Sequence, residues 1–140
     1  MDEHIILRTI VKLLVPFIIM YGLYVQFHGE YSPGGGFQAG VICAAAFIVY
    51  GLVYGLVDAM KIVPVWFAKA CSCVGVLIYA GVGVVTMLKG GNFLEYSTLS
   101  SDPVHGQELG IIIIELGVGL TVFSVMMLVF YMFGERSKDA

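Results

Sequence analysis

The sequence predicts an all-α integral membrane protein with four transmembrane helices and with its N- and C-termini in the cytoplasm. Hydrophobic residues make up 59% of the 140 residues, and the mean hydropathy is +0.95. Charged residues make up 12%, about half the share in average soluble proteins. The apolar residues gather in four long runs. A soluble domain of this length could not hide so much apolar surface from water, so lipid is the expected surrounding.

The four apolar runs are each long enough to cross a membrane as a helix. About 20 helical residues cross a hydrocarbon layer of ~30 Å. The predicted helices run over about 5–27, 36–57, 65–88 and 109–133. The runs are continuous rather than alternating, which favours helices over barrel strands. The first run carries Arg8 and Lys12 and lacks a small-residue cleavage site, so we expect a retained helix rather than a signal peptide.

Basic residues predict the sidedness of the helices. If the N-terminus is cytoplasmic, six of the seven lysines and arginines lie on the cytoplasmic side and Lys89 alone lies outside. The outer connection, residues 89–108, is polar and is the largest expected piece outside the hydrocarbon. It leaves no room for a soluble catalytic domain. No Ser-His-Asp, Cys-His or paired-carboxylate arrangement indicates an enzyme, so we expect neither catalysis nor a bound cofactor.

A glycine-rich stretch, SPGGGFQAG, occupies residues 32–40. Ser32 and Pro33 predict a helix start, with Ser32 as the N-cap and Pro33 as the first helical residue, so that the glycines fall in the first turn. Gly36 and Gly40 then form a GxxxG pair, which permits another helix to approach closely in lipid. A phosphate-binding loop is not indicated, because no Gly-Lys-Ser/Thr follows the glycines.

Small residues continue along the second predicted helix, where Gly51 and Gly55 repeat the four-residue spacing. The three cysteines are expected to be reduced packing residues. Cys71 and Cys73 are two residues apart and therefore point to nearly opposite sides of a helix, which suits neither a disulfide nor a metal clamp.

The glycine-rich stretch also resembles a family signature. It is similar to the PGGGF segment that follows the first helix in the MrpB/MnhB family, whose members belong to the Mrp/Mnh-type multisubunit Na+/H+ antiporters. The string IELGVGLTV at residues 114–122, the chain length and the four predicted helices resemble the same family. The matching residues of the signature are His28, Pro33, Gly34, Gly35, Gly36, Phe37 and Gly40.

This resemblance implies a small membrane subunit of a large complex that exchanges cytoplasmic Na+ for external protons. The implied partners are other antiporter subunits, which include larger ones resembling complex I subunits, together with the lipid of the cell membrane and the transported ions; nucleic acid is not implied. Relatives also occur in membrane-bound hydrogenase complexes, so an equivalent subunit of a redox-driven pump is the alternative. A self-assembling pore would normally show an internal repeat, and none is found.

Three charged residues are candidates for an ion path. Glu115 lies about six residues into the fourth predicted helix, where a carboxylate costs at least ~2.5 kcal/mol unless it is paired or protonated. It either handles an ion or proton or forms a structural pair. Glu108 lies two turns earlier on the same face and is either the mouth of an acidic path or a helix-start acid. Lys69 lies ~16 Å from Glu115 along the membrane normal, so it either extends to the cytoplasmic interface or pairs with another subunit.

Two histidines, His28 and His105, fall on the predicted outer side. No carboxylate-rich metal spacing accompanies them, and membrane haem usually takes histidines from within helices, so we expect no metal site. A role in pH sensing stays open because histidine titrates near neutral pH.

Overall fold

The computed structural model describes residues 2–27, 35–93, 95, 101 and 103–139, and this part of the chain is helical with short turns. The helices are α1 (Asp2–Phe27), α2 (Gly36–Tyr54), α3 (Leu56–Ile62), α4 (Val65–Leu88) and α5 (Pro103–Asp139). Helices α1, α2, α4 and α5 are long and apolar enough to cross a membrane. The predicted all-helical class with four spans is confirmed, and the sidedness of the spans stays a prediction.

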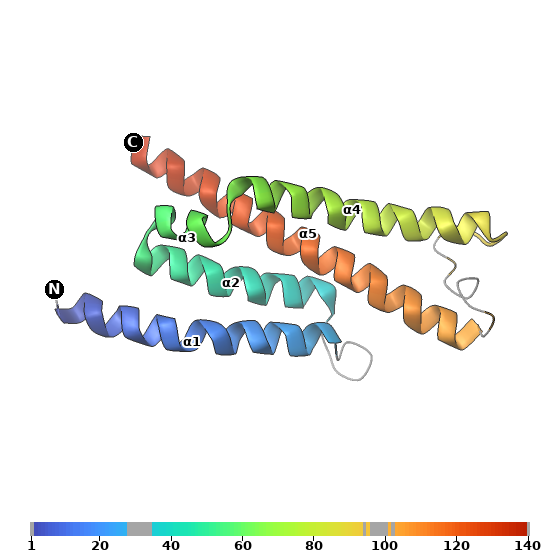
Figure 1. Ribbon diagram of the computed structural model, residues 1–140, viewed down its shortest axis with the longest axis horizontal. Coiled ribbons are helices and arrows are strands. Elements are labelled where there is room, and N and C mark those ends of the chain that lie inside the picture. The colour runs from blue at the N-terminus through green and yellow to red at the C-terminus, as the bar shows by residue number, and fades with distance from the viewer. Residues whose placement is uncertain (1, 28–34, 94, 96–100, 102, 140) are drawn as a thin grey trace.

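The four long helices form an open layer rather than a closed bundle. Helix α1 packs on α2, α2 on α5 and α5 on α4, while α1 barely meets α5. The order across the layer is therefore α1–α2–α5–α4, which differs from the order along the chain (Figure 1). Both chain ends lie at one end of the layer, here called the terminal end. The opposite end, where α1 and α4 finish and α2 and α5 begin, is called the loop end.

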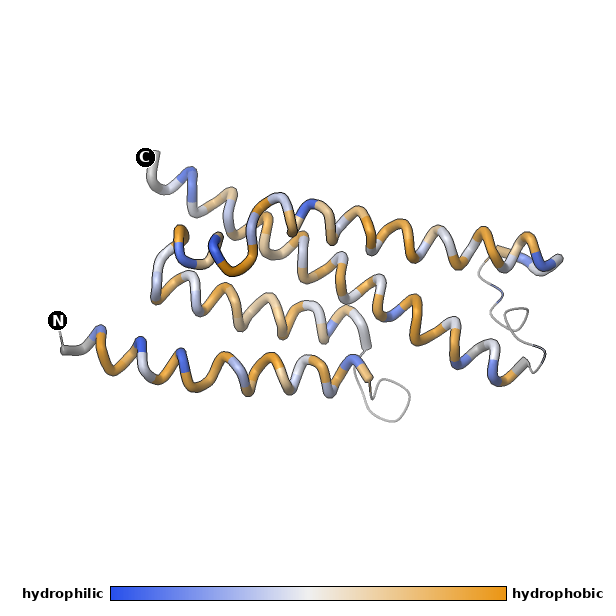
Figure 2. The backbone as a smooth tube through the Cα atoms, viewed as in Figure 1, coloured by the Kyte–Doolittle hydropathy of each residue, from blue (hydrophilic) through white to orange (hydrophobic). Residues whose placement is uncertain are grey.

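Hydrophobic residues predominate along the long helices, and most hydrophilic residues lie toward helix ends (Figure 2). Large apolar side chains are widely exposed, including Leu13 at 65%, Phe17 at 62% and Leu77 at 68%. A helix that is apolar around its circumference belongs in lipid or in a deep core. With only one layer of helices, lipid or neighbouring membrane proteins must cover these surfaces.

The second predicted span is divided in the structure. Helix α2 ends at Tyr54, and Gly55 adopts a positive φ of 106°, which favours glycine. The short helix α3 then occupies much of the expected cytoplasmic loop, with Lys61 paired to Asp58 at 3.4 Å. Gly51 is buried against the Phe130 ring, but Gly55 has open space around it. The expectation that Gly55 repeats the packing spacing is therefore wrong, because it lies at a turn.

Helix α5 extends six residues beyond the predicted span at each end. Its 37 residues correspond to about 55 Å of helix, well beyond a hydrocarbon layer of ~30 Å. It crosses the layer obliquely between α2 and α4 (Figure 1). The added N-terminal residues belong to the connection expected at 89–108, whose polarity hides a helix from a hydropathy argument.

Specific side-chain and backbone contacts join α1 to α2. Gly22 of α1 lies against Cys43 of α2, where a Cβ on the glycine would be 2.7 Å from the cysteine Sγ. At the terminal end, the Tyr54 hydroxyl donates to the Arg8 carbonyl at 2.8 Å. The Arg8 guanidinium lies 5.6 Å from the Tyr54 ring centroid. These separate contacts together hold α1 alongside α2.

A buried cluster joins α3, α4 and α5 at the terminal end. It contains Ala59, Val63, Ala68, Met127 and Tyr131. Tyr131 is 2% exposed, and its hydroxyl lies between the carbonyl oxygens of Val63 at 2.7 Å and Ala59 at 3.2 Å. The hydroxyl donates its hydrogen to a backbone turn that connects two helices. A tyrosine in α5 thus fixes the position of α3 and the start of α4.

We expect Tyr131→Phe to lower the stability of the purified protein by about 1–3 kcal/mol, because the buried Val63 carbonyl loses the hydroxyl donor, while the Ala59 carbonyl keeps the Val63 N–H. The measurement is thermal unfolding in detergent followed by circular dichroism. The matched control is Tyr79→Phe in α4, since Tyr79 is 41% exposed and its hydroxyl makes no hydrogen bond to another described residue. Equal melting temperatures for the Tyr131→Phe variant and the unmodified chain would contradict this account of the cluster.

Candidate functional site at the crossing of α2 and α5

The start of α2 is built around glycines and one glutamine. Gly35 precedes the helix in an extended conformation, and Gly36 is the first helical residue. The Gln38 side chain turns back so that its Oε1 accepts a hydrogen bond from the Gly35 N–H at 3.0 Å. The prediction that the helix starts at Pro33 is therefore wrong, because Gly35 is not helical. Ser32 and Pro33 themselves lie outside the described residues.

Gly36 lies directly on the backbone of Glu115 in α5. A Cβ at Gly36 would collide with the Glu115 carbonyl oxygen and would lie 2.9 Å from its carbonyl carbon and 3.0 Å from its Cα. Since real Cβ atoms do not approach backbone this closely, only glycine permits the observed contact. This crossing explains in physical terms why the sequence places glycine at position 36.

The next turn repeats the arrangement. A Cβ at Gly40 would lie 2.6 Å from the Gly119 carbonyl oxygen, and a Cβ at Gly119 would lie 3.1 Å from the Gly36 carbonyl oxygen. On the other side of α5, Gly117 meets Gly75 of α4, where a Cβ at Gly75 would lie 2.7 Å from the Gly117 carbonyl oxygen. The two glycines of the string IELGVGLTV therefore serve different neighbours, Gly119 for α2 and Gly117 for α4. Small residues at such crossings let helix backbones pack closely in lipid.

The Glu115 carboxylate lies at the N-terminal end of α2. Its Oε1 would be 3.0 Å from a Cβ placed on Gly35, and the residue is partly buried. The first peptide N–H groups of a helix lack intrahelical acceptors, and the helix dipole adds partial positive charge there. This environment stabilises a carboxylate by about 0.3–1 kcal/mol, or up to ~2 kcal/mol when the site is partly buried. Glu115 therefore places a carboxylate of a membrane-spanning helix next to the glycines at the start of α2.

The other charged candidates are not at this crossing. Glu108 lies two turns earlier on α5, exposed, with His105 Nδ1 3.9 Å from its carboxylate. Lys69 lies exposed on α4, beside Ala68 of the terminal-end cluster that also holds Met127. Met127 is 12 residues beyond Glu115, or ~18 Å along the helix. The structure thus brings Glu108 and Glu115 onto one side of α5 and leaves Lys69 near the opposite end.

The glycine signature is described in part. Gly35, Gly36 and Gly40 lie at the crossing, and the Phe37 side chain is 60% exposed. The remaining signature residues, His28, Pro33 and Gly34, lie outside the described residues. Within the described residues, no group of three or more His, Cys, Asp or Glu side chains is placed to hold a metal ion.

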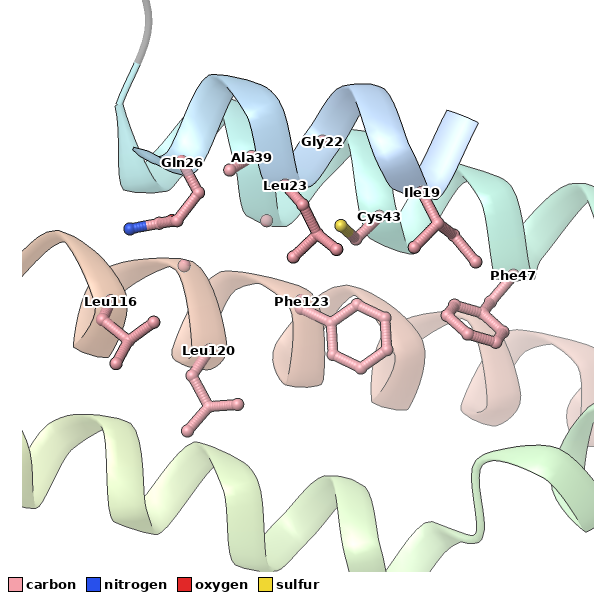
Figure 3. Close-up of a pocket in the computed structure, with 12 residues that line it drawn as sticks. Ile19, Gly22, Leu23, Gln26, Ala39, Cys43, Phe47, Leu116, Leu120 and Phe123 are labelled. Atoms are coloured by element: carbon pink, nitrogen blue, oxygen red, sulfur yellow. The ribbon is translucent and has the colours of Figure 1, made fainter. Parts of the chain in front are cut away.

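An apolar groove of about 400 Å³ runs beside the crossing, between α1 and α5 with α2 as its floor (Figure 3). Leu23, Leu116 and Phe123 line it, and Gln26 supplies an amide near its loop end. The Gln26 Oε1 would lie 2.8 Å from a Cβ on Gly119, one turn from Glu115. Such a lining does not suit a hydrated ion.

Gln26 and Gln38 are not among the site residues predicted from the sequence. Gln38 follows Gly35 by three residues, the spacing of a capping box, and that spacing was a usable signal. Gln26 carries no comparable local signal. It lies in an apolar run, and its proximity to Gly119 depends on how α1 and α5 are placed about α2.

Comparison with known proteins identifies the family. Residues 6–128 match the family model described as a domain related to the MnhB subunit of Na+/H+ antiporters. The chain belongs to the MnhB family. Proteins of Staphylococcus aureus strains Newman and USA300 that carry the name antiporter subunit mnhB2 are 33% identical over 131 residues, which cover 86% of this chain and 92% of theirs. The matched region contains the whole α2–α5 crossing.

Membership of the MnhB family, with four helices able to cross a membrane, makes the chain a multi-pass cell-membrane subunit of a multisubunit Na+/H+ antiporter. The resemblance drawn from the glycine-rich stretch is confirmed. The redox-driven alternative is not favoured, because the family description and the relatives' names refer to antiporters.

Proposed function

We propose that Glu115 is the residue through which this MnhB-family protein takes part in Na+/H+ exchange. Its carboxylate accepts and releases a proton at the loop end of the layer, and Na+ competes with that proton. The chain performs no covalent chemistry of its own. It works by packing against other antiporter subunits and by placing one ionisable group at the edge of the membrane-spanning region.

The observation that supports this proposal is the contact between the Glu115 carboxylate and the start of α2. A helix end contributes up to ~2 kcal/mol to the stability of the charged form, and burial in a membrane costs at least ~2.5 kcal/mol. The two contributions are opposite in sign, so this position both supports and penalises a charge, as we propose for a group that exchanges a proton.

Glu108 and His105 fit this proposal as outer relay groups. They lie exposed on α5, two and three turns before Glu115, and form a pair at 3.9 Å. Protons reaching Glu115 from the loop end would pass along this side of α5. Lys69 has no place in the proposed path, because it follows Ala68 of the terminal-end cluster, whose Met127 lies ~18 Å along α5 from Glu115.

The proposal is tested by carbodiimide labelling of the assembled complex. Dicyclohexylcarbodiimide reacts with protonated carboxyl groups in apolar surroundings, and peptide mass spectrometry locates the adduct. We expect Glu115 to be labelled and Na+ to slow its labelling, because Na+ displaces the proton. The exposed Glu135 near the terminal end is the internal control and should remain unlabelled with or without Na+. Labelling of Glu115 at a rate independent of Na+ would refute the proposal.

A further inference from the structure

Helix α4 is an edge of the helix layer, and one of its sides is uncovered. Its buried residues, which include Ala68, Gly75 and Thr86, face α5. Seven residues on the opposite side are all exposed and fall within ~100° of one another at 100° per residue. This α4 outer face consists of Trp66, Lys69, Ala70, Cys73, Leu77, Ala80 and Val84.

Lys69 gives this face a charge that the described part of the chain does not balance. Ion pairs within 4 Å in the described residues join Lys61 to Asp58 and His105 to Glu108, and Lys69 belongs to neither. It lies one turn inside a membrane-spanning helix. An uncompensated charge costs about 2.5–3.5 kcal/mol at the centre of a span, and a lysine near a helix end reaches either the interface or an anionic partner. No carboxylate in the described residues lies within 4 Å of Lys69, so an anionic partner in the membrane would come from another molecule.

The same face is shaped for a helix. Ala70, Cys73 and Ala80 are small, and next to them a Cβ on Gly81 would meet nothing within 4 Å. Helices in membranes associate through small residues that let backbones approach. The opposite side of α4 already packs through small residues, since Gly75 lies against Gly117 of α5.

We propose that the α4 outer face binds a transmembrane helix of another antiporter subunit that carries Asp or Glu opposite Lys69. The small residues admit the helix, and the ion pair fixes its height in the membrane. This inference rests on the chain being a member of a complex and is independent of any role for Glu115.

The native Cys73 makes the face testable in the assembled complex. A chain with Cys43→Ser and Cys71→Ser retains Cys73, which is modified with benzophenone maleimide in membranes, irradiated and analysed by peptide mass spectrometry. We expect a crosslink to a membrane-spanning peptide of one other subunit, with Asp or Glu in its span. The matched control adds Cys73→Ser and places the label at Val85→Cys, which is 42% exposed outside the face. That label should give a different product.

Charge variants then test the ion pair. Lys69→Glu should reduce the Cys73 crosslink about tenfold or more, because like charges across an interface cost several kcal/mol. Lys69→Arg should retain the crosslink. Since Lys69 is exposed, both variants should reach the membrane at normal levels. Crosslinks to lipid alone, to a second copy of this chain, or to a span without Asp or Glu would overturn the proposal, as would an unchanged crosslink with Lys69→Glu.

Discussion

Glu115→Gln should reduce Na+-driven proton movement by about 100-fold or more, the scale expected when a positioned proton-transfer group is removed. Glutamine keeps the shape of the side chain but cannot exchange a proton. The measurement is the recovery of a pH-sensitive dye on Na+ addition, in vesicles containing the complete complex with an imposed pH gradient. The control is Glu135→Gln, an exposed carboxylate at the other end of α5.

Measuring the assembly of the complex in the Glu115→Gln variant distinguishes a transport role for Glu115 from a structural one. The contact that holds α2 on α5 is made by the Glu115 backbone against Gly36, so the glutamine variant should retain it. We therefore expect the variant complex to run at its normal size on a native gel. A normal exchange rate would eliminate Glu115 as the exchanging group, and a lost complex would assign it a structural role.

Gly36→Leu should prevent the chain from entering the complex. Any Cβ at this position collides with the Glu115 backbone, which cannot move without displacing α5. Overpacking in a well-packed core costs about 1–3 kcal/mol, and a collision with backbone belongs at or above the top of that range. The measurement is the amount of this chain in the native complex, compared with its total amount in the membrane.

Ala45→Leu is the matched control for this substitution. Ala45 is an exposed small residue on the opposite side of α2, nine residues and therefore about 180° from Gly36. Ala45→Leu therefore adds a leucine side chain to α2, as Gly36→Leu does, but on the side that does not face α5. If Gly36→Leu assembled as well as Ala45→Leu, the close α2–α5 crossing would not exist in the complex.

The membrane spans could be predicted from the sequence because each is a long run of apolar residues, and the hydropathy of such a run depends only on its composition. The predicted helix ends were wrong where polar residues continue a helix. Residues 103–108 include His105 and Glu108, so a hydropathy argument ends the span at Leu109, whereas the helix continues to Pro103, a favourable first residue. The short helix α3 was hidden for the same reason, because its charges resemble those of a loop.

The glycine face was predictable, but its partner was not. GxxxG spacing indicates that some helix approaches α2, and nothing local says that Glu115 and Gly119 of α5 lie opposite. The order α1–α2–α5–α4 results from tertiary packing among four helices that are all apolar enough to cross a membrane. The sequence identified Glu115 as a candidate because a carboxylate is energetically costly in lipid. Its position next to the start of α2 is seen only in the structure.

This chain works as one member of an antiporter complex, and its open helix layer leaves both edges uncovered. The most direct measurement is purification in gentle detergent through a C-terminal tag, with identification of every chain that copurifies. We predict a defined set of other antiporter membrane subunits in fixed proportion to this one. Recovery of the chain alone, or only with copies of itself, would contradict the account.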